Sequence, residues 1–191
     1  MGLTTVALAL GIVISYLRGG RLGRLVDSDL KVTWMLVTGF ALQASVDWAS
    51  EEGYLGDALG LILLQASFVL LLGWFAINRH MRGSVLLFIG FALNAIVIAA
   101  NGAMPVDVEA IRAAGVTDPV IPFGKHEILT AHTALPWLAD RFPIVAIRSS
   151  ISIGDIVLAA GTIPLTHDLM TSRSAPDRRR ALRRPAQAGA G

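Results

Sequence analysis

The chain has 191 residues, of which 54% are hydrophobic and 16% are charged, and its mean hydropathy is +0.62. Ordinary soluble domains contain about 45–50% apolar residues, so this composition excludes a typical water-soluble protein and favours a membrane protein. There is no cysteine, which excludes a disulfide framework and a thiolate site. The pI of about 9.5 is basic because arginines cluster beside the apolar segments, and this pattern does not indicate nucleic-acid binding.

Five apolar segments follow one another along the chain, each long enough, or nearly so, to cross a bilayer as a helix. They are residues 3–17, 32–48, 54–77, 83–100 and 151–170. We expect residues 1–171 to form one all-α membrane domain with five spans, and residues 101–150 to form a large loop outside the cytoplasm. Residues 172–191 are rich in Arg, Pro, Ala and Gly, and we expect them to be a disordered cytoplasmic tail.

The first segment has no basic residue ahead of it, so we interpret it as a retained span and not as a signal peptide. Its small residues Ala7, Gly11 and Ser15 recur every four positions and share one face of a helix. Such a face permits close contact with a second helix, although small residues are also common in spans with no such role.

The positive charges predict how the spans are oriented. Of the sixteen Lys and Arg residues, four lie between the first two spans, two between the third and fourth, and six in the tail. Because basic residues favour the cytoplasmic side, we expect the amino terminus outside and the carboxyl terminus inside. A four-span alternative would lose the short first segment. The residues expected at the inner membrane surface, near anionic lipid, are Arg18, Arg21, Arg24, Arg178, Arg179 and Arg180.

The polar side chains within the spans occur near the predicted outer ends. Gln43 and Asn94 lie in the second and fourth spans, and Asp155 lies near the start of the fifth. At about 1.5 Å per residue, all three fall within roughly 5–11 Å of the outer helix ends. Polar groups at this depth normally face the bundle interior or a wet cavity, which predicts a pocket below the loop. The predicted pocket residues are Gln43, Asp47, Asn94, Asn101, Ser152 and Asp155.

These residues also have purely structural interpretations. Ser152 and Asp155 form a Ser-x-x-Asp pattern, which is typical of a capping box at the start of a helix. Gln43 and Asn94 would then serve only as hydrogen-bonding residues between helices. A cap does not prevent Asp155 from facing a pocket, so the sequence leaves both roles open.

The long loop contains one dense segment, residues 125–140, which we interpret as a short helix lying at the outer interface. Trp137 is a residue type that sits at the level of the lipid headgroups. The residue types that bind metals in this segment are His126, Glu127, His132 and Asp140. The His-x5-His spacing does not place two imidazoles on one helix face, so we expect no metal site and no cofactor.

Asp140 and Asp155 are the candidate catalytic residues. Two carboxyl groups that lie close together share a proton and differ in pKa, so one can act as an acid and the other as a base. No spacing in the sequence shows that the two side chains meet. A catalytic pair is therefore the alternative to a binding pocket, and an enzyme is not the leading interpretation.

Several motifs extend over almost the whole chain outside the tail. They are Leu17-Arg18-Gly19-Gly20-Arg21-Leu22, Gln43, Asn101-Gly102-x-Met104-Pro105-Val106, Leu129-Thr130-x-x-Thr133-x-Leu135-x-x-Leu138-x-Asp140 and Ser152-Ile153-Gly154-Asp155. In this combination the chain resembles the bacterial membrane-protein family catalogued as domain of unknown function 5317. The resemblance implies an integral membrane protein of the cell envelope and assigns no activity.

The expected protein is therefore a multi-pass protein of the bacterial plasma membrane. Its outward-facing polar pocket is expected to bind a lipid, a small molecule or a membrane partner. The alternative is a membrane-embedded hydrolase or transferase that uses Asp155 with Asp140, and an oligomeric transporter ranks third. The expected partners are membrane lipids and either a second copy of the chain or another membrane protein, with no nucleic acid.

Overall fold

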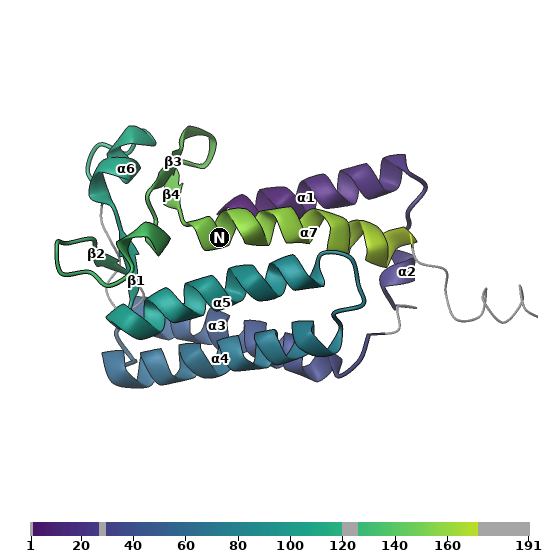
Figure 1. Cartoon of the computed structure of the whole chain (residues 1–191), viewed down its shortest axis with the longest axis horizontal. Coiled ribbons are helices and arrows are strands. Elements are labelled where there is room, and N and C mark those ends of the chain that lie inside the picture. Colours follow the sequence, from purple (N-terminus) through teal and green to yellow (C-terminus); the bar gives the residue numbers. More distant parts are fainter. Residues whose placement is uncertain (1, 27–29, 120–125, 172–191) are drawn as a thin grey trace, which may run out of the picture.

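Five long helices dominate the computed structural model, which describes residues 2–26, 30–119 and 126–171 (Figure 1). The ends of each long helix lie within three residues of one of the five predicted apolar segments. The helices are α1 (Gly2–Leu17), the short α2 (Gly23–Val26), α3 (Thr33–Glu51), α4 (Asp57–Ile77), α5 (Ser84–Asn101) and α7 (Ile153–Thr171). The predicted tail, residues 172–191, lies outside the described residues.

Two of these helices are long and apolar enough to cross a membrane, namely residues Ala58–Ile77 of α4 and Ser84–Asn101 of α5. Residues Leu3–Leu17 of α1 are apolar but form a shorter helix. The fold class is therefore mostly helical, as predicted, with apolar helices that weakly suggest a membrane location.

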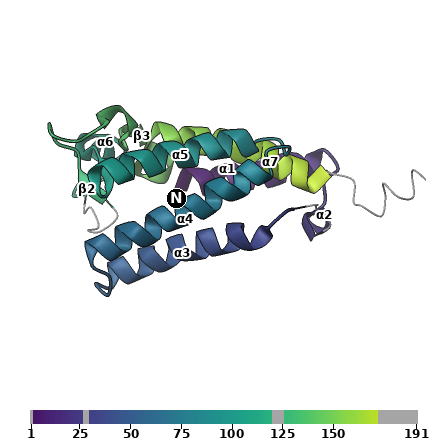
Figure 2. The same ribbon diagram turned by 60° about the horizontal axis from the view of Figure 1, so that its bottom comes forward.

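The long helices pack side by side in the order α1, α7, α5, α4 and α3. Figure 2 shows α3 and α4 as a pair, with α5, α7 and α1 on the other side of the bundle. The first and last helices, α1 and α7, start at the same end and run in the same direction (Figure 1). Among the described residues, α1 and α3 do not share the extensive contact that the other neighbours make, so they form the two edges of an open arc.

Small residues allow α7 to approach both of its neighbours closely. A Cβ atom added to Gly90 of α5 would lie 2.8 Å from the carbonyl oxygen of Gly154 in α7. On the other side of α7, a Cβ atom on Gly11 would lie 3.0 Å from Cβ of Thr166. Ala7 and Ser15 are also buried, so the small-residue face of α1 packs against α7.

Aromatic side chains join α3, α4 and α5. The ring of Phe91 in α5 lies 6.1 Å from that of Phe40, 6.2 Å from that of Phe68 and 5.6 Å from that of Phe75. The amide of Gln65, in the middle of α4, donates to the carbonyl oxygen of Ala95 at 3.2 Å. This polar residue of the third apolar segment therefore serves as a link between two helices.

Short elements between α5 and α7 gather at one end of the bundle, on the left in Figure 1. They are β1 (Met104–Val106), α6 (Val108–Ala113), β2 (His126–Ile128), η1 (Pro136–Leu138), β3 (Phe142–Ile144), η2 (Val145–Ile147) and β4 (Ser149–Ile151). Strands β1 and β2 pair in parallel, and β3 and β4 pair antiparallel.

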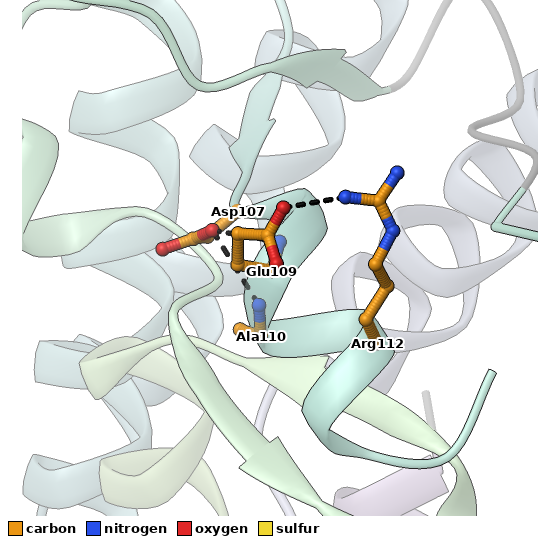
Figure 3. Close-up of polar contacts among 4 residues, drawn as sticks. All are labelled: Asp107, Glu109, Ala110 and Arg112. Carbon is orange, nitrogen blue, oxygen red and sulfur yellow. Dashed lines mark hydrogen bonds and ion pairs between the residues drawn. The ribbon is translucent and has the colours of Figure 1, made fainter. Parts of the chain in front are cut away.

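Helix α6 has its own local stabilisation (Figure 3). Oδ1 of Asp107 accepts hydrogen bonds from the backbone N–H groups of Glu109 and Ala110, which caps the helix. Glu109 and Arg112, one turn apart, form an ion pair. The turn that follows contains Gly115 at φ +90°, a left-handed conformation that favours glycine and ends the helix.

The prediction of a short helix within residues 125–140 is wrong for the described part of that segment. His126–Ile128 forms strand β2 beside β1, and only Pro136–Leu138 forms a single 3-10 turn. Pro136 lacks an N–H group, and Leu135 before it has φ +53°, which lies outside the helical region. The Thr133 hydroxyl accepts a hydrogen bond from the backbone of Thr130 and closes a turn there.

Candidate functional site

A cavity of about 540 Å³ lies among the five long helices and extends to the loop. This volume is within the range of about 300–1,000 Å³ that is usual for sites of small molecules. The helices give it an apolar wall that includes Leu36, Phe40, Leu64, Phe68, Leu87 and Leu165. At the loop end the wall is polar and includes Gln43, Asn94, His126, Asp140, Ser150 and Asp155.

The cavity reaches the surface at the open side of the arc. Leu8 of α1 and Phe40 of α3 both line the cavity, yet each remains 45% exposed. A side chain can do both only where the cavity wall meets the outside. The opening therefore lies along the edges formed by α1 and α3.

Ser152 and Asp155 form the predicted capping box at the start of α7. The backbone N–H of Asp155 donates to Oγ of Ser152 at 3.0 Å, and the backbone N–H of Ser152 donates to Oδ2 of Asp155 at 3.2 Å. Asp155 also lines the cavity, whereas Ser152 is fully buried behind it. Asp155 therefore both caps α7 and faces the cavity.

Asn94 of α5 completes this network from the neighbouring helix. Its amide nitrogen donates to Oδ1 of Asp155 at 3.1 Å, and its amide oxygen accepts from the Ser152 hydroxyl at 3.2 Å. A Cβ atom on Gly154 would lie 1.9 Å from that amide oxygen, so only glycine leaves room for Asn94. The Asn94 amide and the backbone N–H of Ser152 therefore hold the Asp155 carboxylate in one orientation.

Asp140 approaches the same cavity from the loop. Its backbone N–H donates to the carbonyl oxygen of Pro105 at 2.9 Å, and its carbonyl oxygen accepts from the N–H of Asp107 at 3.0 Å. The residue is only 9% exposed, and its buried Oδ1 has no hydrogen-bond partner among the described residues. Buried polar atoms are normally hydrogen-bonded, so this atom calls for an explanation.

The surroundings of Asp140 favour its neutral form. Burial, and to a smaller extent the negative charge of Asp155, raise the pKa of the Asp140 carboxyl from 3.8 to about 8. The two candidate catalytic residues thus line one cavity and influence each other electrostatically. At neutral pH Asp140 is protonated, while Asp155 accepts two hydrogen bonds.

The other predicted pocket residues divide into two groups. Gln43 lines the cavity and is 7% exposed, and its amide has no hydrogen bond to the described residues. Asp47, one turn further along α3, does not line the cavity. Nor does Asn101, whose amide instead pairs with the N–H and carbonyl oxygen of Ala134 at 2.8 and 3.0 Å and fastens the loop to α5.

The structure also bears on the predicted metal and membrane-surface residues. Within residues 2–26, 30–119 and 126–171, no three side chains of His, Asp or Glu lie together in a way that could hold a metal ion. Arg18 and Arg21 are exposed at the end opposite the loop, and Arg24 donates to the carbonyl oxygen of Thr171 at 3.5 Å. Arg178, Arg179 and Arg180 lie outside the described residues.

Several polar residues of the cavity wall escaped prediction. Thr4 and Thr5 come from the first turn of α1, and Ser149 and Ser150 come from β4. The threonines could have been predicted from the expected topology. If the first span starts outside the cytoplasm, its first turn lies at the same depth as the start of the last span, where Asp155 was placed. The serines had none, since their position depends on the pairing of β3 with β4.

Fold and site together define a small helical bundle with apolar helices and an internal cavity that is polar at one end. The chain belongs to the family of unknown function DUF5317, whose model matches residues 27–166. This confirms the resemblance noted from the sequence motifs. No curated protein and no solved structure was found to match the chain.

Proposed function

We propose that the protein is a five-span integral membrane protein of the cell membrane, with its amino terminus and its loop outside the cytoplasm and its carboxyl terminus inside. The five long helices have 16 to 21 residues. At 1.5 Å per residue they are roughly 24–32 Å long, close to the thickness of the hydrocarbon core, about 30 Å.

Exposed apolar side chains support this proposal. A water-soluble protein rarely exposes a continuous apolar surface, yet these helices expose large hydrophobic residues along their outer faces. Examples from α1, α3, α4 and α5 are Val13, Val37, Ile62, Val69, Val85 and Ile96, each 52–67% exposed. Lipid would cover this surface.

Aromatic and basic residues at the two ends support the orientation. Trp34 is exposed at the start of α3, and Trp48 and Tyr54 are exposed at its other end with their rings 5.7 Å apart, as in the aromatic belts of membrane proteins. The backbone N–H groups of Arg21 and Arg82 both donate to the end of α7, to the carbonyl oxygen of Met170 and to the carboxylate of Asp168 respectively. The basic segments thus gather at the end opposite the loop, which the positive-inside rule assigns to the cytoplasm.

We further propose that the cavity binds an amphiphile, a molecule with an apolar chain and a polar head. The observation that carries this function is the division of the cavity wall, which is mainly apolar between the helices and polar at the loop. The hydroxyls of Thr162 and Thr166, which also line the helical part, are bonded to the backbone of α7. Its opening between α1 and α3 would face the hydrocarbon core. An apolar chain could then enter sideways from the outer leaflet while its head stays level with Asp140 and Asp155.

The fluorescence of Trp74 tests this proposal. Trp74 lines the cavity and is 1% exposed, whereas the chain's other three tryptophans, Trp34, Trp48 and Trp137, are 53–61% exposed. Replacing those three by phenylalanine leaves Trp74 as the sole reporter. An amphiphile brominated along its chain should then quench Trp74 saturably in detergent micelles, because bromine must come close to the indole.

A matched pair of variants controls for quenching by the micelle itself. Leu36→Phe adds bulk to the cavity wall and should weaken saturable quenching, whereas Val37→Phe, on the adjacent outward-facing position, should leave it unchanged. Equal quenching curves in the two variants, or no saturable quenching of Trp74, would show that the cavity does not take up the chain.

A second candidate function is hydrolysis, favoured by the carboxyl pair at the cavity. Asp140 is protonated at neutral pH and could give its proton to a leaving group, while the Asp155 carboxylate takes a proton from the attacking water. This function predicts that wild-type protein, incubated with total bacterial membrane lipid, generates products detectable by mass spectrometry that are absent with Asp140→Asn. Identical lipid profiles for the two proteins would contradict it.

A further inference from the structure

We infer that the cavity selects an amphiphile whose head group is an ammonium, held between Asp140 and Asp155 with the help of Gln43. This inference rests on the proposed binding of an amphiphile and adds the chemistry of its head. It follows from the charges of the wall, from two buried side chains without partners, and from the rigidity of the acceptors.

The charges of the wall disfavour an anionic head. The described lining residues include two carboxyl groups, the imidazole of His126, and neither Lys nor Arg. A phosphate, sulfate or carboxylate head would therefore be buried beside the Asp155 carboxylate with no permanently charged cation in the described wall, which is unfavourable. An ammonium group has the opposite charge and complements the site.

The unsatisfied groups at the loop end of the wall call for a hydrogen-bond donor. Oδ1 of Asp140 is buried without a partner among the described residues, and the amide of Gln43, a residue that is 7% exposed, has no hydrogen bond to them either. The two side chains come from different parts of the chain, the loop and α3, and both line the cavity. An ammonium carries N–H donors only, and it would satisfy the acceptor oxygens of both.

The acceptors are held in place before any ligand arrives. Each oxygen of Asp155 already accepts one hydrogen bond, from Asn94 or from the backbone of Ser152, and a carboxylate oxygen can accept a second. The backbone of Asp140 is fixed by its hydrogen bonds to Pro105 and Asp107. A site with pre-oriented acceptors binds at a smaller cost in side-chain ordering.

Three probes of equal chain length test the inference: a brominated primary alkylamine and the corresponding alcohol and carboxylic acid. Their affinities are measured at neutral pH by quenching of Trp74 in the full chain, with the other tryptophans replaced, in a non-ionic detergent. The amine should bind at least about tenfold more tightly than the alcohol or the acid, as expected for a charge pair removed from water.

Two substitutions locate the head group. Asp155→Asn should reduce the affinity for the amine by about tenfold or more and leave that for the alcohol nearly unchanged. Asp140→Asn replaces a carboxyl that is neutral at this pH, so it should reduce the affinity for the amine by a smaller factor. Asp107→Asn is the matched control, because Asp107 lies in the same loop, does not line the cavity, and caps α6 in a way that asparagine can reproduce. Melting temperatures in the same detergent show that each variant is folded.

The outcomes separate this inference from the proposed function. Equal affinities for the three probes, or unchanged affinity for the amine in both Asp140→Asn and Asp155→Asn, would overturn the ammonium assignment and leave amphiphile binding intact. If no probe quenches Trp74 saturably in folded protein, the proposed function fails and the inference fails with it.

Discussion

Asp140 lies in a segment whose backbone bonds to Pro105 on one side and to Asp107 on the other. The residue is only 9% exposed, so its carboxyl lies in surroundings that disfavour its charge. The negative charge of Asp155 disfavours it further. Protonation of this single residue is thereby coupled to the folding of the loop.

The stability of the protein should fall as the pH rises from about 4 to about 8. The unfolded chain loses the Asp140 proton near pH 3.8, whereas the folded protein keeps it to about pH 8, so folding takes up a proton within this window. Below it both states are protonated and above it both are ionised, so this contribution no longer varies. At about 1.4 kcal/mol per pKa unit, a rise from 3.8 to about 8 corresponds to a total loss on the order of 6 kcal/mol.

Denaturant unfolding in mild detergent, repeated across this pH range, measures the effect. Asp140→Asn removes the titrating group and should flatten the profile, while Asp107→Asn, on a half-buried residue of the same loop, should not. If the wild-type protein and Asp140→Asn show the same dependence on pH, the buried carboxyl is not its source.

Among the elements, α7 is the one on which most packing depends, because it contacts α1 on one side and α5 on the other. Its capping box and its glycines were visible in the sequence, since both are local patterns. The residue that bonds to this capping box, Asn94, could not be identified from the sequence. Asn94 is 58 residues from Ser152 and 61 from Asp155, and only the packing of α5 on α7 brings them together.

Gly154→Ala should destabilise the protein by roughly 1–3 kcal/mol, as is typical when a close contact is overfilled. The added methyl group would collide with the Asn94 amide and displace it from Asp155. Thermal unfolding in detergent measures the loss. Gly56→Ala is the control, because a Cβ atom there meets nothing within 4 Å and its φ of −73° suits alanine. Equal melting temperatures for the two variants would contradict this account.

The segment around β2 is one whose structure the sequence pattern predicted wrongly. His126, Thr130 and Thr133 have a spacing that fits one face of a helix, but the local chemistry does not favour a helix. A threonine side chain closes a turn there, and a proline follows. Pairing of β2 with β1 then decides the structure of His126–Ile128. That pairing joins residues 22 positions apart, which no local pattern reveals.

At the scale of the whole molecule, hydrophobicity was sufficient to locate the five long helices, because each is a continuous apolar run. The same information placed Gln43, Asn94 and Asp155 at one depth, and all three line the cavity. It could not show which helices are neighbours. The cavity depends on that arrangement, since it lies within an arc whose ends, α1 and α3, do not close extensively on each other in the described residues.

The proposed topology predicts the accessibility of engineered cysteines, which are unambiguous because the natural chain has none. In intact cells a membrane-impermeant maleimide should label Thr117→Cys in the loop, and it should label His80→Cys only after the membrane is permeabilised. Both positions are exposed, so burial does not hide either one. Labelling of His80→Cys in intact cells would contradict the proposed orientation.

The pairing of α1 with α7 has a consequence for the order of assembly during synthesis. Helices α3, α4 and α5 can pack as successive hairpins while the chain is being made, but α1 must wait for the last long helix before Gly11 meets Thr166. One side of the cavity is therefore built last. A chain that stops at Ser152 should retain the pairing of α3 with α4 and of α4 with α5, yet leave α1 without its packing partner.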